Sequence, residues 1–174
     1  MQNRIKIVST DRLDIHLVDT NDAAFILEIL NSPGWLAYIG DRGVRTLEDA
    51  EKYIQEKFVT SYELNGYAIY KMSTIGANTP IGLCGFVKRD FLEHPDIGFA
   101  ILEPWEGKGY MLEAAKALLD YGKTALNFST VLAFTNVENP KSQSLLIKLG
   151  LQANGKIKPY EDEEELLLFS TPNI

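Results

Sequence analysis

Hydrophobic and polar residues recur along this chain with two different periods, which predict strands and helices. Leu13, Ile15 and Leu17 alternate with polar residues, the period of a half-buried strand over residues 12–18. Residues 20–31 instead carry apolar side chains at helical spacing, and Pro33-Gly34 is expected to end that helix. The chain therefore begins with a strand followed by a helix.

A second helix is predicted to begin at Thr46. Thr46-Leu47-Glu48-Asp49 resembles a capping box, in which a hydroxyl and a carboxylate three residues apart bond to each other's backbone N–H groups. The apolar residues that follow lie on the inner side of this helix: Ala50, Tyr53, Ile54 and Phe58. We expect this side to pack against the core.

Strands dominate the rest of the chain. The β-rich segments bounded by turn residues predict strands at 66–73, 80–89, 95–102, 129–135, 151–158 and 165–171, and helical patterns occupy about 110–125 and 140–149. Pro140 is favoured in a first helical turn, and Gly150 suits a helix end. Helices that interrupt strands in this way predict one α/β (α+β) domain over residues 1–174, with a central mixed sheet covered by helices.

Composition and charge narrow the choice of partners. The 174 residues are 45% hydrophobic and 24% charged, as in ordinary soluble domains, and the formal net charge is −7. This charge argues against nucleic acid or an anionic membrane as the main partner, and it favours a cation such as an amine. Cys84 is the only cysteine and is expected to be a small buried residue. No apolar run approaches the length of a membrane span, so a cytoplasmic location is expected.

The candidate chemistry lies in the loop Trp105-Glu106-Gly107-Lys108-Gly109, between a predicted strand and an alanine-rich helix. No Ser, Thr, Asp or Asn caps that helix, so its first N–H groups need another acceptor, and a helix N-terminus attracts anions. A Walker A loop is excluded by Leu102 and Gly109, and a dinucleotide fingerprint is excluded by Leu112. A tight turn with Lys108 in solvent stays open as the simpler interpretation.

The loop resembles the acetyl-CoA loop of the GNAT superfamily of N-acetyltransferases, Gln/Arg-x-x-Gly-x-Gly/Ala. Pro104 replaces the first residue of that pattern. Three further segments, in order, are similar to the RimJ/RimL-type branch: Ser9-Thr10-Asp11-Arg12-Leu13; Thr46 with Asp49-Ala50 and Tyr53-Ile54; and Asn139-Pro140-Lys141-Ser142 with Lys148-Leu149-Gly150-Leu151. That branch often shows Trp-Gly-Lys-Gly-Tyr, which Glu106 interrupts here. The resemblance covers about residues 9–171.

This resemblance implies a mostly antiparallel sheet and direct acetyl transfer from acetyl-CoA (coenzyme A) to a primary amine. The acceptor would be a protein N-terminus or a small amine, no metal would be needed, and the protein would be a monomer or homodimer. The implied cofactor-binding residues are Ile101, Leu102, Gly107, Lys108, Gly109, Tyr110, Met111 and Asn139. The backbone amides from Gly107 to Met111 are expected to matter more than the Lys108 side chain. Trp35 and Tyr38 are expected on the acceptor side.

Acetyl transfer needs a base for the ammonium, a donor for the oxyanion and a donor for the leaving thiolate. Asp96 and His94 are the candidate bases, and Asp96 would act through water or after partial burial. Strand N–H groups from Phe99 to Leu102 could serve the oxyanion. Many GNAT enzymes place a tyrosine where Leu146 stands here, so Ser142 is the candidate thiolate donor, with helix capping as its alternative role.

Two rival functions remain at this point. Pro104, Glu106 and Leu146 would also suit a non-catalytic acetyl-CoA-binding sensor or structural module of the same fold. An unrelated phosphate-binding α/β protein is the other possibility, and it would bind ATP in place of coenzyme A.

Overall fold

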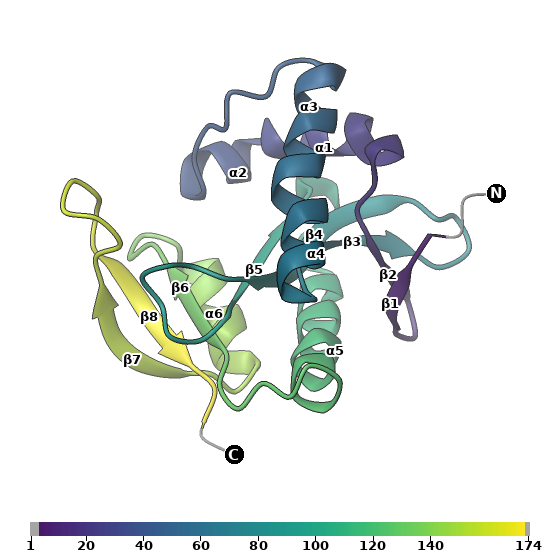
Figure 1. Cartoon of the computed structure of the whole chain (residues 1–174). Helices are drawn as coiled ribbons and strands as arrows, with labels where there is room; N and C mark the ends of the chain where they lie inside the picture. Colours follow the sequence, from purple (N-terminus) through teal and green to yellow (C-terminus); the bar gives the residue numbers. More distant parts are fainter. Residues whose placement is uncertain (1–3, 173–174) are drawn as a thin grey trace.

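An eight-stranded sheet forms the centre of the computed structural model, which describes residues 4–172 (Figure 1). The strands are β1 (Lys6–Ser9), β2 (Leu13–Leu17), β3 (Ile69–Thr74), β4 (Pro80–Val87), β5 (Asp96–Ile101), β6 (Leu132–Thr135), β7 (Gln152–Ile157) and β8 (Leu166–Ser170). Their order is β1-β2-β3-β4-β5-β6-β8-β7, and among these strands only β5 and β6 pair in parallel. The predicted mixed, mostly antiparallel sheet is confirmed.

Helices cover both faces of this sheet. They are α1 (Ala23–Leu30), α2 (Pro33–Tyr38), α3 (Leu47–Tyr53), α4 (Thr60–Asn65), α5 (Tyr110–Thr124) and α6 (Pro140–Lys148). A π-helical segment, Ile54–Val59, joins α3 to α4, and short 3₁₀ turns occupy Thr20–Asp22 and Glu103–Trp105. Helices α1 to α3 pack on one face, where they share a core with Leu83 and Leu102. Helices α5 and α6 pack on the other face.

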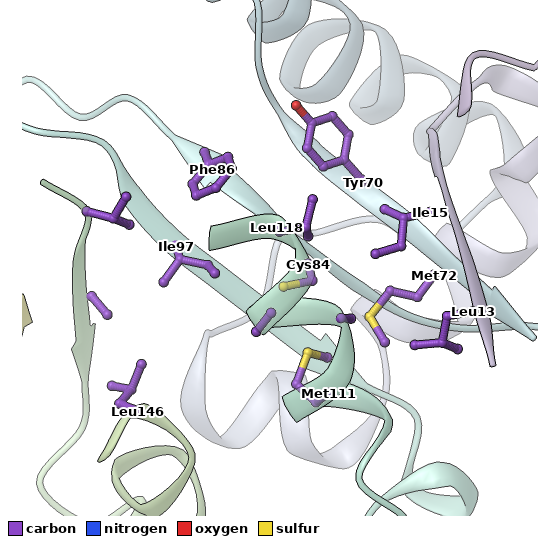
Figure 2. Close-up of a cluster of buried hydrophobic side chains, with 14 of the residues drawn as sticks. Leu13, Ile15, Tyr70, Met72, Cys84, Phe86, Ile97, Met111, Leu118 and Leu146 are labelled. Atoms are coloured by element: carbon purple, nitrogen blue, oxygen red, sulfur yellow. The ribbon is translucent and has the colours of Figure 1, made fainter. Parts of the chain in front are cut away.

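The larger core lies between the sheet and helices α5 and α6 (Figure 2). Met111 and Leu118 of α5 and Leu146 of α6 meet strand residues such as Cys84 and Ile97 there. Cys84 is fully buried, as its apolar surroundings in the sequence predict. This core fixes the position of α5, the helix that follows the glycine loop.

Two elements differ from the prediction. β1 was not expected because a bulge between Lys6 and Val8 disturbs the alternation on which strand prediction depends. Pro33 does not only follow α1: it is the first residue of α2, a position that proline favours because its missing N–H would be unpaired there. The sequence pattern could not distinguish these two roles of the proline.

The Thr46 helix begins as predicted but ends later. Thr46 and Asp49 form the expected capping box, with the Asp49 N–H donating to the Thr46 hydroxyl at 3.1 Å. The helical segment then continues past Phe58 to Asn65 and ends where Gly66 adopts a φ of 77°. β3 consequently begins at Ile69, three residues after the predicted start of that strand. Within residues 4–172, no helix is long and apolar enough to cross a membrane.

Candidate active site

A gap opens between β5 and β6. The two strands pair only at Asp96 and Leu132, beside the 2.9 Å bond from the Leu132 N–H to the Pro95 carbonyl. On its other side β5 is bonded to β4, and the Leu102 N–H donates to Ile81 at 2.9 Å. Because successive N–H groups of a strand point in opposite directions, those of Phe99 and Ile101 face the gap. These two amides are the open donors of β5.

The glycine loop lies at the wide end of this gap, where β5 ends. Gly107 and Gly109 have φ values of 71° and 79°, a region that glycine enters without strain. Gly109 is the N-cap of α5, and no side chain caps the helix. Among residues 4–172, the N–H groups from Gly107 to Leu112 have no acceptor, and the helical bonds begin with Glu113 donating to Gly109 at 3.1 Å.

This loop has the properties of an anion site. Several N–H groups converge at one helix N-terminus, where the helix dipole adds about half a positive charge. The expected absence of a side-chain cap is confirmed. Phosphate oxygens can therefore accept hydrogen bonds from the loop amides, which otherwise have no acceptor from a capping side chain.

The side chains near the loop mostly pack against the protein. The Lys108 ammonium donates to the Pro104 carbonyl at 2.9 Å and lies 5.3 Å from the centre of the Trp105 ring. Tyr110 meets Trp105 edge to face at 5.8 Å, and Met111 is buried in the core. In this conformation the loop offers backbone amides, and Lys108 is turned back from them.

Ile101 and Leu102 differ in what they can offer a cofactor. The Leu102 N–H is bonded to Ile81, and its carbonyl accepts from the Trp105 N–H at 2.9 Å. The backbone N–H and carbonyl of Leu102 thus both form hydrogen bonds inside the fold, and its side chain is buried. Of these two predicted contacts, only the Ile101 N–H faces the gap.

The start of α6 lies opposite the loop. Lys141 and Glu106 join the two segments through an ion pair of 2.7 Å. Asn139 is the N-cap of α6, because its side-chain oxygen accepts from the Ser142 N–H at 3.2 Å. The capping role considered for Ser142 therefore belongs to Asn139. Within the described part of the chain, the half-buried Ser142 hydroxyl has no hydrogen-bond partner.

Replacing Ser142 with alanine is expected to lower turnover by about 10- to 100-fold if this hydroxyl serves the departing thiolate. The KM for acetyl-CoA should change little, because thiolate charge develops only as the bond breaks. The melting temperature should also change little, since Asn139 and not Ser142 caps α6. Steady-state kinetics and a thermal melt test both points. Normal turnover with lower stability would assign Ser142 to the fold alone.

Asp96 lies at the narrow end of the gap on the opposite face of the sheet from Ser142. It shares that face with Ala100, whose neighbours include α1 to α3, whereas α6 lies on the other face. Asp96 is 2% exposed and accepts a 2.8 Å bond from the Arg89 side chain. Burial raises the pKa of Asp96, and Arg89 opposes this change without cancelling it. The buried environment brings this carboxyl closer to the properties of a general base.

His94, the other candidate base, lies outside β5. It belongs to the loop between β4 and β5, as the following Pro95 predicts. There it lines a cavity of about 610 Å³ that also includes Phe91, Leu132 and Ser170. Leu132 is the residue that pairs with Asp96, so this cavity adjoins the narrow end of the gap.

The two residues predicted on the acceptor side have different surroundings. Trp35 is a residue of α2 and is 9% exposed. Its indole N–H donates to the Gly40 carbonyl at 3.0 Å, and its side chain packs in the core that α1 to α3 share with the sheet. Tyr38 is 44% exposed. The pKa of Lys141 is raised first by its bond to Glu106 and further by the charge of Tyr38. Of the two predicted residues, only Tyr38 exposes its side chain for contact with an acceptor.

Two site residues were missed from the sequence. Arg89 could have been found by pairing the predicted strands, because an antiparallel register that matches Val87 with Asp96 places Arg89 close to that acid. Arg12 was noted only as part of the motif Thr10-Asp11-Arg12-Leu13. It donates to the Lys108 carbonyl at 3.0 Å, a contact that no local pattern indicates.

Comparisons with known proteins identify the family of this chain. The family model for the acetyltransferase (GNAT) domain matches residues 12–152. An uncharacterized N-acetyltransferase, p20, of Bacillus licheniformis is 30% identical over 162 residues, which are 91% of this chain and 89% of that protein. The [ribosomal protein uS5]-alanine N-acetyltransferase of Escherichia coli is 33% identical over 82 residues, 46% of this chain and 42% of the relative.

A solved structure confirms the fold. The ribosomal-protein-S5-alanine acetyltransferase of Vibrio fischeri aligns with a TM-score of 0.81 at 20% identity, over 97% of each chain. The likeness to the RimJ/RimL-type branch, predicted from four ordered motifs, is thereby confirmed. The chain belongs to the GNAT family of acetyltransferases, and it is an N-acetyltransferase that transfers an acetyl group to an amine.

Proposed function

We propose that this enzyme acetylates the α-amine of a protein N-terminus and binds acetyl-CoA through the glycine loop and the gap between β5 and β6. The binding of acetyl-CoA in this proposal is supported by the row of N–H groups from Gly107 to Leu112, which have no acceptor within residues 4–172. Acetyl-CoA brings the phosphates that such amides bind and the thioester that an amine attacks.

Backbone groups do most of the binding in this proposal. The loop amides from Gly107 to Met111 hold the pyrophosphate, and Tyr110 packs beside it. The open N–H groups of Phe99 and Ile101 lie along the gap and can bond to the extended arm of the co-substrate or to the oxyanion. Asn139 fixes the start of α6 and so holds Ser142 on the cofactor face.

The acceptor approaches from the other face of the sheet in this proposal. Asp96 takes the proton from the ammonium, directly or through water, which restores the lone pair that attacks the thioester. Ser142 then donates to the departing thiolate. Base and thiolate donor on opposite faces of one gap allow the two substrates to meet without competing for space.

A protein acceptor is favoured by the E. coli relative, whose name specifies the alanine of ribosomal protein uS5. The cavity lined by His94 and by Leu132, the strand partner of Asp96, also suits a peptide. Its lining combines polar groups such as Thr130, Gln152 and Asn154 with the aromatic Phe91. A panel that compares peptides bearing free or blocked N-termini with small amines, read by thiol release and product mass, tests this choice. Acetylation of small amines alone would reject a protein acceptor.

Coenzyme A is expected to raise the melting temperature of this protein, and ATP is not. A ligand at one hundred times its dissociation constant adds about 2.7 kcal/mol to the free energy of unfolding. The measurement is a thermal melt with each ligand at millimolar concentration. Without a shift from coenzyme A or acetyl-CoA, the cofactor assignment fails, and a shift with ATP alone would favour a different phosphate-binding protein.

A non-catalytic sensor would give a different result. Leu146 occupies the position of the tyrosine found in many GNAT enzymes and is fully buried, so it leaves no donor there. A sensor would bind coenzyme A but release no thiol with any amine in the panel. Turnover with one acceptor excludes the sensor.

A further inference from the structure

Arg12 contacts the glycine loop although it lies in the turn between β1 and β2. Its Nη1 donates to the Lys108 carbonyl at 3.0 Å, and its Nε donates to Glu113 at 2.6 Å. The guanidinium carbon lies 4.3 Å from the centre of the Tyr110 ring. One side chain thus joins the loop, the first residue of α5 and the first turn of α5.

The turn that carries Arg12 is itself fixed to α5. The Arg12 N–H donates to Glu113 Oε1 at 3.0 Å, and the Thr10 hydroxyl donates to the same oxygen at 2.5 Å. Leu13, the next residue, is fully buried in the core cluster that includes Met111 (Figure 2). The position of Arg12 is therefore set by both the sheet and the helix.

The bond to Lys108 determines the direction of the next amide. All described peptide bonds are trans, so the Lys108 carbonyl and the Gly109 N–H point in opposite directions. With the carbonyl bonded to Arg12, the Gly109 N–H points away from Arg12. Gly109 forms one side of this peptide, and its conformational freedom would let the peptide rotate if the carbonyl lost its donor.

Arg12 also offsets an unfavourable charge. Partial burial would raise the pKa of Glu113, but the bonds from Thr10 and Arg12 lower it more, so this carboxylate is ionised at neutral pH. A negative charge in the first turn of α5 would repel phosphate. The ion pair with Arg12 neutralises that charge beside the loop.

We infer that Arg12 is a positioning residue for the cofactor loop: its forked side chain holds the Lys108–Gly109 peptide so that the Gly109 N–H is presented to phosphate. This inference rests on the proposed function. In this inference, Thr10 and Glu113 hold Arg12 in place. The motif Thr10-Asp11-Arg12-Leu13 then contributes to the cofactor loop, although the two segments are far apart in the sequence.

The test compares acetyl-CoA with S-acetylpantetheine, a donor that carries the same thioester without phosphates. Arg12→Met should raise the KM for acetyl-CoA about tenfold, as expected for one charge-assisted hydrogen bond, and should leave kcat nearly unchanged. Its kcat/KM for S-acetylpantetheine should stay within about twofold of the wild-type value. Activity with this second donor also shows that the variant is folded.

Arg12→Lys separates orientation from charge. Lysine keeps the charge but lacks the fork that reaches both Glu113 and the Lys108 carbonyl, so we expect a loss similar to that of Arg12→Met. Lys6→Met is the matched control, because Lys6 lies in the same hairpin and pairs with Asp14 at 3.0 Å, and no bond joins it to the loop. This control should leave the KM for acetyl-CoA unchanged.

Three results would overturn the inference. Wild-type kinetics in Arg12→Lys would show that charge alone matters, and equal losses with both donors would reduce Arg12 to a general role in folding. Unchanged kinetics in Arg12→Met would remove any role. These results leave the proposed function standing, whereas failure of the wild-type protein to bind coenzyme A would reject both.

Discussion

Asp96→Asn should lower kcat by about 10²- to 10⁴-fold, the range that general bases contribute. The amide keeps the size of the side chain and cannot accept the proton of the incoming ammonium. The variant should still bind coenzyme A, because Asp96 lies at the narrow end of the gap, remote from the loop. Steady-state kinetics together with a coenzyme A titration would show this separation of turnover from binding.

The same variant should be as stable as the wild type at neutral pH, or more stable. Burial raises the pKa of Asp96 above its value in the unfolded chain, so the ionised carboxylate is disfavoured by folding. The stability associated with protonated Asp96 is lost as pH rises through the folded-state pKa, and asparagine avoids that loss. The advantage should disappear at acid pH, where both side chains are neutral. Arg89, left without its partner, is about one-third exposed and can be hydrated.

Asp90→Asn is the matched control, since Asp90 is an exposed acid in the loop before β5. It should leave kcat unchanged. If Asp96→Asn keeps full activity, the base is His94 or water, and His94→Ala would decide between them.

Gly109→Val should reduce the affinity for coenzyme A by about 100-fold or more. The φ of 79° at this position is strained for any residue with a Cβ, and a β-branched side chain is a severe case. An added Cβ would lie 3.4 Å from the Arg12 guanidinium, and the valine methyls extend further. The side chain would therefore disturb both the amide direction and the approach of phosphate. Titration calorimetry measures the loss.

Two variants control for charge and strain. Lys108→Ala should weaken binding by only about threefold, because the ammonium is bonded to Pro104 and the amides carry the binding. Gly155→Val introduces similar strain at a φ of 83° in β7, outside the loop, and should leave the affinity unchanged. If Lys108→Ala eliminates binding while Gly109→Val retains it, the roles assigned to side chain and backbone are reversed.

Much of the fold could be predicted because it depends on local patterns. The alternation at Leu13, Ile15 and Leu17, the capping box at Thr46 and the missing cap before Tyr110 all concern neighbours in the sequence, and each is present in the structure. β1 and α2 were missed because a bulge and an initial proline give local signals that also fit other structures.

The site was harder to predict because it depends on contacts between distant segments. The opening between β5 and β6 follows from their single pairing at Asp96, which no residue in either strand specifies alone. Trp35 illustrates the limit of such prediction. An aromatic side chain of this kind suits a binding surface, but its indole N–H donates to the Gly40 carbonyl inside the fold. Arg12 illustrates the reverse case, an exposed cation whose partner is 96 residues further along the chain.

The open side of β5 has a consequence for self-association. A strand edge with free N–H groups is a template on which a strand from another chain can pair, and proteins protect such edges. This edge is inside the eight-stranded order, where β6 joins β5 at one end. At the other end the ion pair between Glu106 and Lys141 spans the opening. The protein thus keeps the hydrogen-bonding capacity of an edge strand inside the sheet, between a paired end and an ion pair, and does not add a third outer edge to those of β1 and β7.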